Sequence, residues 1–218
     1  MSPGGDAGTY RCLSTAPDPW RPGVSIIVIE FVTLDGIVTD PDGRAGTPTG
    51  GWAFRHGPAT VAGDKFRLGS VLDDGVMLLG RRTWQQFSRL WPTREDPFSA
   101  RMNAVPKLVA SRTLTDVSAW ANSTVLAGDL LDAVKREERD VIITGSLSVV
   151  HALMAADLVD EYRLLTFPTL VGSGERLFPA GGPPTHLECV SAEQAGAAVL
   201  ARYRREVSAA GRDQTATI

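Results

Sequence analysis

The segment that most constrains the fold is VMLLGRRTW, residues 76–84. Its unbroken apolar start is typical of a strand buried on both faces of a sheet, and a helix is expected to begin directly after Gly80. Gly80 lets the backbone pass close to a ligand, and the free N–H groups of a first helical turn attract anions. Arg81 and Arg82 add two positive charges where a structural helix favours acidic residues. A phosphate site is one interpretation, and two solvated surface arginines are the alternative.

The same unit, a buried strand followed by a small, hydroxylated or basic turn, occurs twice more. Residues 107–110 precede Ser111-Arg112-Thr113, and residues 140–144 precede Gly145-Ser146-Leu147-Ser148. In open α/β sheets, ligands bind across the carboxyl ends of the strands, where all three turns are expected to lie. Three turns at one edge suit a dinucleotide better than a single phosphate.

Hydrophobic periodicity predicts the remaining elements of an α/β fold. Further strands are expected over residues 24–32, 122–126, 160–167, 186–191 and 199–203. Helices are expected over residues 59–72, 82–90, 98–103 and 130–136 and again after residue 148, with a hairpin-like return over residues 168–178. Short connections between the last strands imply antiparallel pairing, so the predicted sheet is mixed.

The two ends of the chain and one internal loop differ from this pattern. Residues 1–22 and 208–218 are predicted to be a mobile extension and a polar tail around one domain, residues 23–207. The loop of residues 37–57 is rich in turn residues and follows a buried strand. Because long glycine-rich loops in compact domains are often functional, we expect an active-site loop in which Trp52 contacts the substrate. An ordinary surface loop is the alternative.

Composition excludes several classes of function. A net charge of −3 gives no general attraction to nucleic acid. The longest apolar run is too short to cross a bilayer, and the start of the chain lacks the pattern of a secretory signal. Cys12 and Cys189 are too few and too far apart for a zinc site or a disulfide framework. We therefore expect a cytoplasmic protein, without metal, that acts on a small molecule.

Taken together, these motifs resemble the dihydrofolate-reductase-like superfamily over about residues 24–203. The order Leu34-Asp35-Gly36, LLGRRTW, KLVASRT and residues 141–178 is similar to the branch that contains the reductase domain of the bifunctional riboflavin-biosynthesis deaminase/reductase. The resemblance implies a three-layer αβα fold with a mainly parallel sheet, NADPH as hydride donor, and a homodimer formed through the late antiparallel strands. The deaminase half carries a Pro-Cys-x-x-Cys zinc signature, which this sequence lacks, so a stand-alone reductase is implied.

The resemblance also implies roles for individual residues in cofactor binding. The turn after residue 79 matches a Gly-Arg-x-Thr turn that holds cofactor phosphates, and the turn after residue 110 matches the one that receives the adenosine 2′-phosphate, which favours NADPH over NADH. The turn after residue 144 matches a glycine turn over the pyrophosphate, without the commoner Gly-Gly pair. The implied cofactor-binding residues are Gly36, Gly80, Arg81, Arg82, Thr83, Ser111, Arg112, Gly145, Ser146, Leu147 and Ser148.

The proton donor has two candidates. Reduction of a C=N or C=O bond needs a proton as well as a hydride. Asp64 lies 16 residues before Gly80, near where folate reductases carry the acid that binds the pterin, and Asp35 is the competing candidate. An ordinary surface aspartate is the alternative for Asp64. The implied activity is reduction of a small heterocyclic, carbonyl or imine compound, similar to that of 5-amino-6-(5-phosphoribosylamino)uracil reductase. Dihydrofolate reduction and a non-catalytic NADPH-binding module remain the alternatives.

Overall fold

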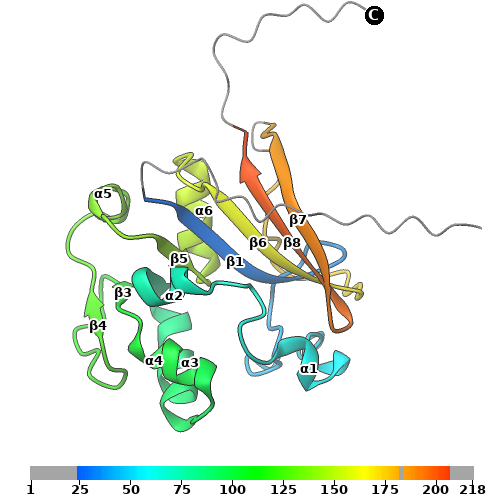
Figure 1. Ribbon diagram of the computed structural model, residues 1–218, viewed down its shortest axis with the longest axis horizontal. Coiled ribbons are helices and arrows are strands. Elements are labelled where there is room, and N and C mark those ends of the chain that lie inside the picture. The colour runs from blue at the N-terminus through cyan, green and yellow to red at the C-terminus, as the bar shows by residue number, and fades with distance from the viewer. Residues whose placement is uncertain (1–23, 182–183, 207–218) are drawn as a thin grey trace, which may run out of the picture.

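The computed structural model describes residues 24–181 and 184–206, so the predicted extension and tail lie outside the described residues. The strands are β1 (Ile26–Thr33), β2 (Val76–Gly80), β3 (Lys107–Ala110), β4 (Ser123–Val125), β5 (Val141–Ile143), β6 (Glu161–Phe167), β7 (Leu187–Ala195) and β8 (Ala198–Arg205). They form one sheet in the order β4-β3-β2-β5-β1-β6-β8-β7 (Figure 1). Pairing is parallel from β4 to β6 and antiparallel for β6 with β8 and for β8 with β7. The predicted mixed, mainly parallel sheet is confirmed.

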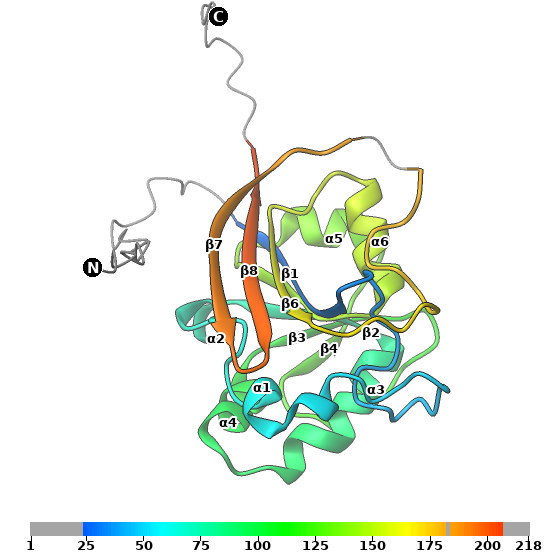
Figure 2. The same cartoon turned by 90° about the vertical axis from the view of Figure 1, so that its right-hand side faces the viewer.

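Helices cover both faces of this sheet. They are η1 (Phe54–His56), α1 (Pro58–Val61), α2 (Ser70–Asp74), α3 (Arg81–Leu90), η2 (Trp91–Thr93), α4 (Pro97–Ala104), α5 (Leu130–Arg136) and α6 (Leu147–Ala155). One hydrophobic core lies between the sheet and α5 and α6, and a second lies between the sheet and α2, α3 and α4 (Figure 2). This is the predicted three-layer αβα arrangement. No helix in the described part of the chain is long and apolar enough to span a membrane.

β1 shows how the sequence produces these layers. Successive strand side chains point to opposite faces, and Val28 and Val32 pack in the core beneath α5 and α6 while Ile27 and Ile29 pack in the core beneath α2 to α4. β1 therefore contributes apolar side chains to both cores. Glu30 is the exception within this run, and it lies on the α6 side of the strand by the same alternation.

Two predictions of regular structure are wrong. The single helix expected over residues 59–72 is two short helices, α1 and α2, separated by turns. Gly63, Arg67 and Gly69 have φ values of +71°, +53° and +52° in that segment, and a right-handed helix cannot continue through such residues. Residues 168–178 form no hairpin of strands either, and their one bridge joins Arg176 to Ile37.

Candidate functional site

A cleft of about 790 Å³ lies at the carboxyl ends of the parallel strands. Its lining includes the residues with which β2 and β3 end and those that directly follow β5. All three predicted turns therefore meet in one cleft, and of the residues assigned to the cofactor only Gly36 lies outside the lining. The members of the turns that line the cleft are Gly80, Arg81, Arg82, Thr83, Ser111, Arg112, Gly145, Ser146, Leu147 and Ser148.

The turns after β2 and β5 are in direct contact. A Cβ atom on Gly80 would lie 2.2 Å from the Ser146 Oγ atom, and Gly145 has a φ of +71° that a side chain would disfavour. The Thr83 and Ser146 hydroxyls are 3.1 Å apart, within hydrogen-bonding distance. Glycine at these two positions is what lets the two turns approach closely enough to share one ligand.

Two helices begin at this cleft without a side-chain cap. Gly80 precedes α3 and Ser146 precedes α6, and neither makes a side-chain hydrogen bond to its helix. By contrast, the Asp96 and Asp129 carboxylates accept N–H bonds at the starts of α4 and α5. The first N–H groups of α3 and α6 thus keep their capacity to bind an anion in the cleft.

The rim of the cleft has an excess of positive charge. Arg81, Arg82 and Arg112 are exposed, and none of them forms an ion pair with another described residue. The Arg81 guanidinium donates to the Thr113 hydroxyl at 2.7 Å, which links the turns after β2 and β3. The Ser111 hydroxyl closes its own turn by accepting the Leu114 N–H at 2.9 Å. Three guanidinium groups without a carboxylate partner among the described residues, together with hydroxyl and backbone donors, make a set suited to several phosphates.

The rest of the cleft has a different, largely aromatic wall. Phe87 and Trp91 pack edge to face with their centroids 5.8 Å apart, and Trp91 and Phe98 do the same at 5.7 Å. Two cations, Lys65 and Arg94, also line this part of the molecule. Such a wall suits a flat ring that carries a negative charge.

Asp35 does not line the cleft. Its carboxylate accepts hydrogen bonds from the Thr33 hydroxyl at 2.6 Å and the Gly172 N–H at 2.7 Å, and these bonds lower its pKa. It therefore ties the turn after β1 to the loop of residues 170–172. Gly36, with a φ of +82°, belongs to the same turn. This placement favours a structural role for Asp35 over that of a proton donor.

Asp64 and Trp52 also lie outside the cleft lining. The Asp64 carboxylate accepts the Leu68 and Gly69 N–H groups, each at 2.9 Å, and so shapes the turn before α2. Trp52 is only 2% exposed; its ring N–H donates to the Thr39 carbonyl at 2.9 Å, and its ring packs against Phe167. Trp52 holds the long loop onto the core, and this buried position gives no support to a substrate contact.

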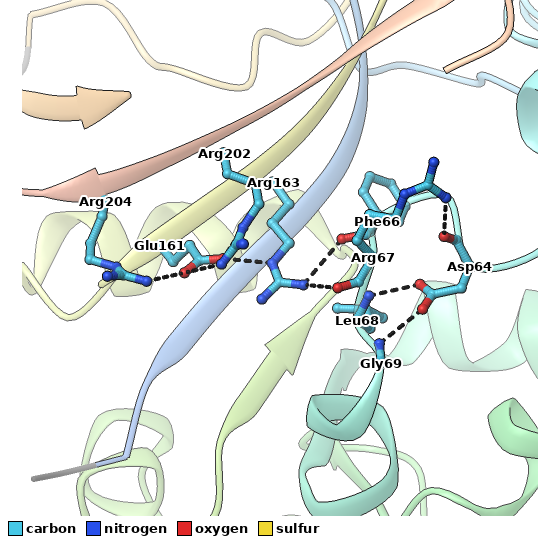
Figure 3. Close-up of polar contacts among 9 residues, drawn as sticks. All are labelled: Asp64, Phe66, Arg67, Leu68, Gly69, Glu161, Arg163, Arg202 and Arg204. Carbon is cyan, nitrogen blue, oxygen red and sulfur yellow. Dashed lines mark hydrogen bonds and ion pairs between the residues drawn. The ribbon is translucent and has the colours of Figure 1, made fainter. Parts of the chain in front are cut away.

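The turn shaped by Asp64 is anchored to β6 by a buried arginine (Figure 3). The Arg163 guanidinium donates to the carbonyls of Phe66, at 3.1 Å, and of Arg67, while its Nε atom lies 2.6 Å from a Glu161 oxygen. Because Phe66 lines the cleft, this arginine fixes one wall of it from behind.

Sequence reasoning missed Glu30, which lines the cleft from the middle of β1. Its carboxyl group accepts the N–H of Gly145, in the predicted pyrophosphate turn. Burial raises the pKa of Glu30 to about 8, and this hydrogen bond opposes the rise without cancelling it. The signal in the sequence was a single acid inside the apolar run SIIVIEFV. Burying an acid is costly, so an acid within a buried strand is a candidate functional residue.

Comparison with known protein families finds one match that covers most of the described chain. Residues 24–201 match the family described as the RibD C-terminal domain. The uncharacterized protein YyaP of Bacillus subtilis (strain 168) is 28% identical over 113 residues, which cover 47% of this chain and 58% of that protein. The chain thus aligns with somewhat more than half the length of that curated relative.

Solved structures share the fold. A putative riboflavin biosynthesis protein from Shewanella sp. PV-4 superposes with a TM-score of 0.65 at 19% identity, over 84% of this chain and 100% of that one. A diaminohydroxyphosphoribosylaminopyrimidine deaminase/5-amino-6-(5-phosphoribosylamino)uracil reductase from Thermotoga maritima gives a TM-score of 0.50 at 16% identity, over 84% of this chain and 57% of that one. At these identities the likeness concerns the fold alone.

Proposed function

The chain belongs to the RibD C-terminal domain family, and from this membership we propose that it is an NADPH-dependent reductase of a small heterocyclic, carbonyl or imine compound. The observation that supports the proposal most is the meeting of three polar turns, from three separate strands, in one cleft. A dinucleotide has phosphates spread along its length, and three turns with free donors match that spread better than they match a single anion.

NADPH, when bound, supplies the hydride. The turn after β2 and the start of α6 would hold the diphosphate through their uncapped N–H groups and through Thr83 and Ser146. Ser111 and Arg112 would receive the 2′-phosphate, because a guanidinium binds a phosphate through two charge-assisted hydrogen bonds. Absence of the 2′-phosphate would leave Arg112 without a partner, so NADPH should bind more tightly than NADH.

For the substrate, we propose a compound similar to that of 5-amino-6-(5-phosphoribosylamino)uracil reductase. The aromatic wall of Phe87, Trp91 and Phe98 would stack on the ring, and Lys65 and Arg94 would pair with the phosphate. Dihydrofolate is the second candidate, because the same wall and the Arg94 guanidinium, 5.4 Å above the Trp91 ring, also suit a pterin with a carboxylate. A non-catalytic NADPH-binding module is the third.

A binding measurement followed by an activity measurement tests these three candidates in order. NADPH at a hundred times its dissociation constant should raise the free energy of unfolding by about 2.7 kcal/mol. NADPH oxidation is then followed with the phosphoribosylaminouracil and with dihydrofolate. No stabilisation by NADPH contradicts the proposal, and turnover of dihydrofolate alone favours the second candidate. Stabilisation without oxidation of NADPH by either compound favours the binding module.

We also propose that the protein is a cytoplasmic homodimer that uses its late antiparallel strands as the interface. β7 is the last strand of the sheet, and an edge strand has one row of backbone groups available for pairing. Sedimentation velocity measures the assembly directly. A monomer at micromolar concentration would contradict the dimer and leave the proposed activity unaffected.

A further inference from the structure

Glu30 lies where the cofactor turns meet the middle of the sheet. Val28 pairs with Ile143 of β5, so two residues further on Glu30 lies beside Gly145, whose N–H donates to its carboxyl group. On its other side Glu30 pairs with Leu164 of β6. Protein atoms surround the carboxyl group densely, yet part of the residue stays open to the cleft. Its position is therefore fixed by β5 and β6, and the cleft is its route to a ligand.

The other carboxyl groups of the cleft are committed elsewhere or lie at its edge. Asp40 accepts the Ala45 and Thr47 N–H groups at 2.8 and 2.9 Å; burial acts to raise its pKa, but these bonds outweigh burial and lower it. Asp42 pairs with the Arg44 guanidinium at 3.3 Å, and Glu175 is exposed on the rim. No histidine, cysteine or tyrosine occurs in the lining formed by the described residues.

The surroundings of Glu30 favour its neutral form. Leu164 on β6 and Leu147, Ser148 and Val149 at the start of α6 are uncharged. None of the other charged groups that line the cleft forms an ion pair with it; these are Lys65, Arg81, Arg82, Arg94, Arg112, Asp40, Asp42 and Glu175. A buried carboxyl group without a cation holds its proton to a higher pH than an exposed one. A diphosphate bound nearby would add negative charge and strengthen this preference.

We propose that Glu30 is the acid that gives the substrate its proton, an assignment that rests on the proposed reductase function. In the step, bound NADPH would supply the hydride that reduces the substrate carbon and would itself be oxidised to NADP⁺. The π electrons of the C=N or C=O bond would take the proton from the Glu30 carboxyl group, which is left as a carboxylate that regains a proton from water. Asp35 and Asp64 keep their structural roles.

The first test needs no substrate. Infrared difference spectra between the wild type and Glu30→Gln, with and without NADPH, should contain the C=O stretch of a protonated carboxylic acid at neutral pH. That band should fade as pH rises through about 8 in the free protein. Glutamine can still accept the Gly145 N–H, so the variant should fold and bind NADPH within about threefold of the wild type. A band missing at pH 7 would overturn the assignment whatever the substrate is.

The second test uses turnover of the phosphoribosylaminouracil. General acid catalysis contributes about 10²- to 10⁴-fold, so Glu30→Gln should lower kcat by that factor and leave KM nearly unchanged. Asp35→Asn and Asp64→Asn, which change the rival candidates, should keep kcat within about tenfold. Wild-type protein that oxidises no NADPH with any substrate would contradict the proposed function. Normal kcat in Glu30→Gln beside an active wild type would contradict the assignment of Glu30 alone.

Discussion

Two glutamates on neighbouring strands, one buried and one partly open to the cleft, differ in the direction of their pKa shifts. Glu161 on β6 is 5% exposed and has three cationic partners: Arg163 Nε at 2.6 Å, Arg202 Nη2 at 3.0 Å and Arg204 Nη2 at 3.2 Å (Figure 3). Burial acts to raise its pKa, but the arginines outweigh burial and lower it. Glu30 on β1 has no such partner among residues 24–181 and 184–206, and burial raises its pKa to about 8. The surroundings of Glu161 thus favour the carboxylate, and those of Glu30 favour the protonated acid.

The arginines differ in the same way. Those around Glu161 have their carboxylate within the chain, whereas Arg81, Arg82 and Arg112 at the cleft have none among the described residues. Burial alone therefore does not distinguish a structural charge from a functional one in this molecule. Charges that the chain itself leaves without a partner are the ones available to a ligand.

The largest expected effect on stability comes from removing Glu161. Glu161→Ala would leave Arg163, which is 4% exposed, beside two further arginines without their shared carboxylate. Breaking a buried pair by removing one partner typically destabilises by about 3 to 5 kcal/mol, and we expect a loss in that range in urea denaturation. Arg163 also anchors the turn at Phe66, which lines the cleft, so NADPH binding by Glu161→Ala should be measured together with its stability. A loss below about 1 kcal/mol would mean that Glu161 and its arginines do not stabilise the fold, and would contradict their structural role.

Glu30 should give the protein a stability that falls as pH rises. Its folded pKa of about 8 lies above its unfolded value of 4.5, so between these values the folded state holds a proton that the unfolded state releases. The stabilisation is complete below pH 4.5 and is lost as pH rises through about 8. The slope is up to about 1.4 kcal/mol per pH unit, or about 2 kcal/mol between pH 6 and 7.5.

Urea denaturation of the wild type and Glu30→Gln at several pH values measures this slope. Glutamine does not titrate, so the difference between the two proteins isolates Glu30 from the histidines. Relative to the wild type, Glu30→Gln should gain stability as pH rises, while losing the proton that the reaction needs. A constant difference from pH 6 to 8 would place the folded pKa of Glu30 near its ordinary value.

Local patterns in the sequence were enough to predict much of the fold and the rim of the cleft. The bounds of β3 and α5 are those expected, because an apolar run and an amphipathic stripe determine them within a few residues. The turns after β2, β3 and β5 could be placed together because parallel strands end at one edge. Each of these inferences uses only neighbours along the chain.

The acids could not be assigned in that way. Glu30 owes its raised pKa to burial, which tertiary structure produces and no local pattern contains, and the Gly145 N–H that opposes this rise lies 115 positions away in the sequence. Asp64 looked like a site residue by spacing, but its partners are the N–H groups of the turn before α2, a turn that replaced the expected helix. The role of an acid depends on the groups that tertiary structure brings to it.

A smaller effect is expected from replacing Arg112, one of the cleft arginines that have no carboxylate partner among the described residues. A hydrogen bond to a charged group contributes about 1.5 to 3 kcal/mol, so Arg112→Ala should weaken NADPH binding about thirtyfold and NADH binding less than threefold. Fluorescence titration with both cofactors measures this. Arg89→Ala removes an exposed arginine of α3 that does not line the cleft and is the matched control. Equal losses for NADPH and NADH would place Arg112 away from the 2′-phosphate.

The smallest effect is expected from an exposed ion pair that otherwise matches the buried one. Arg67 Nε lies 2.7 Å from Glu193 Oε1, nearly the Arg163–Glu161 distance, but these side chains are 53% and 47% exposed. Water solvates both charges after one is removed, so Glu193→Ala should lower the free energy of unfolding by less than about 1 kcal/mol. The Arg67 carbonyl stays bound by Arg163, so the turn should keep its shape. A loss as large as that of Glu161→Ala would mean that contact distance, rather than burial, decides how much an ion pair stabilises this protein.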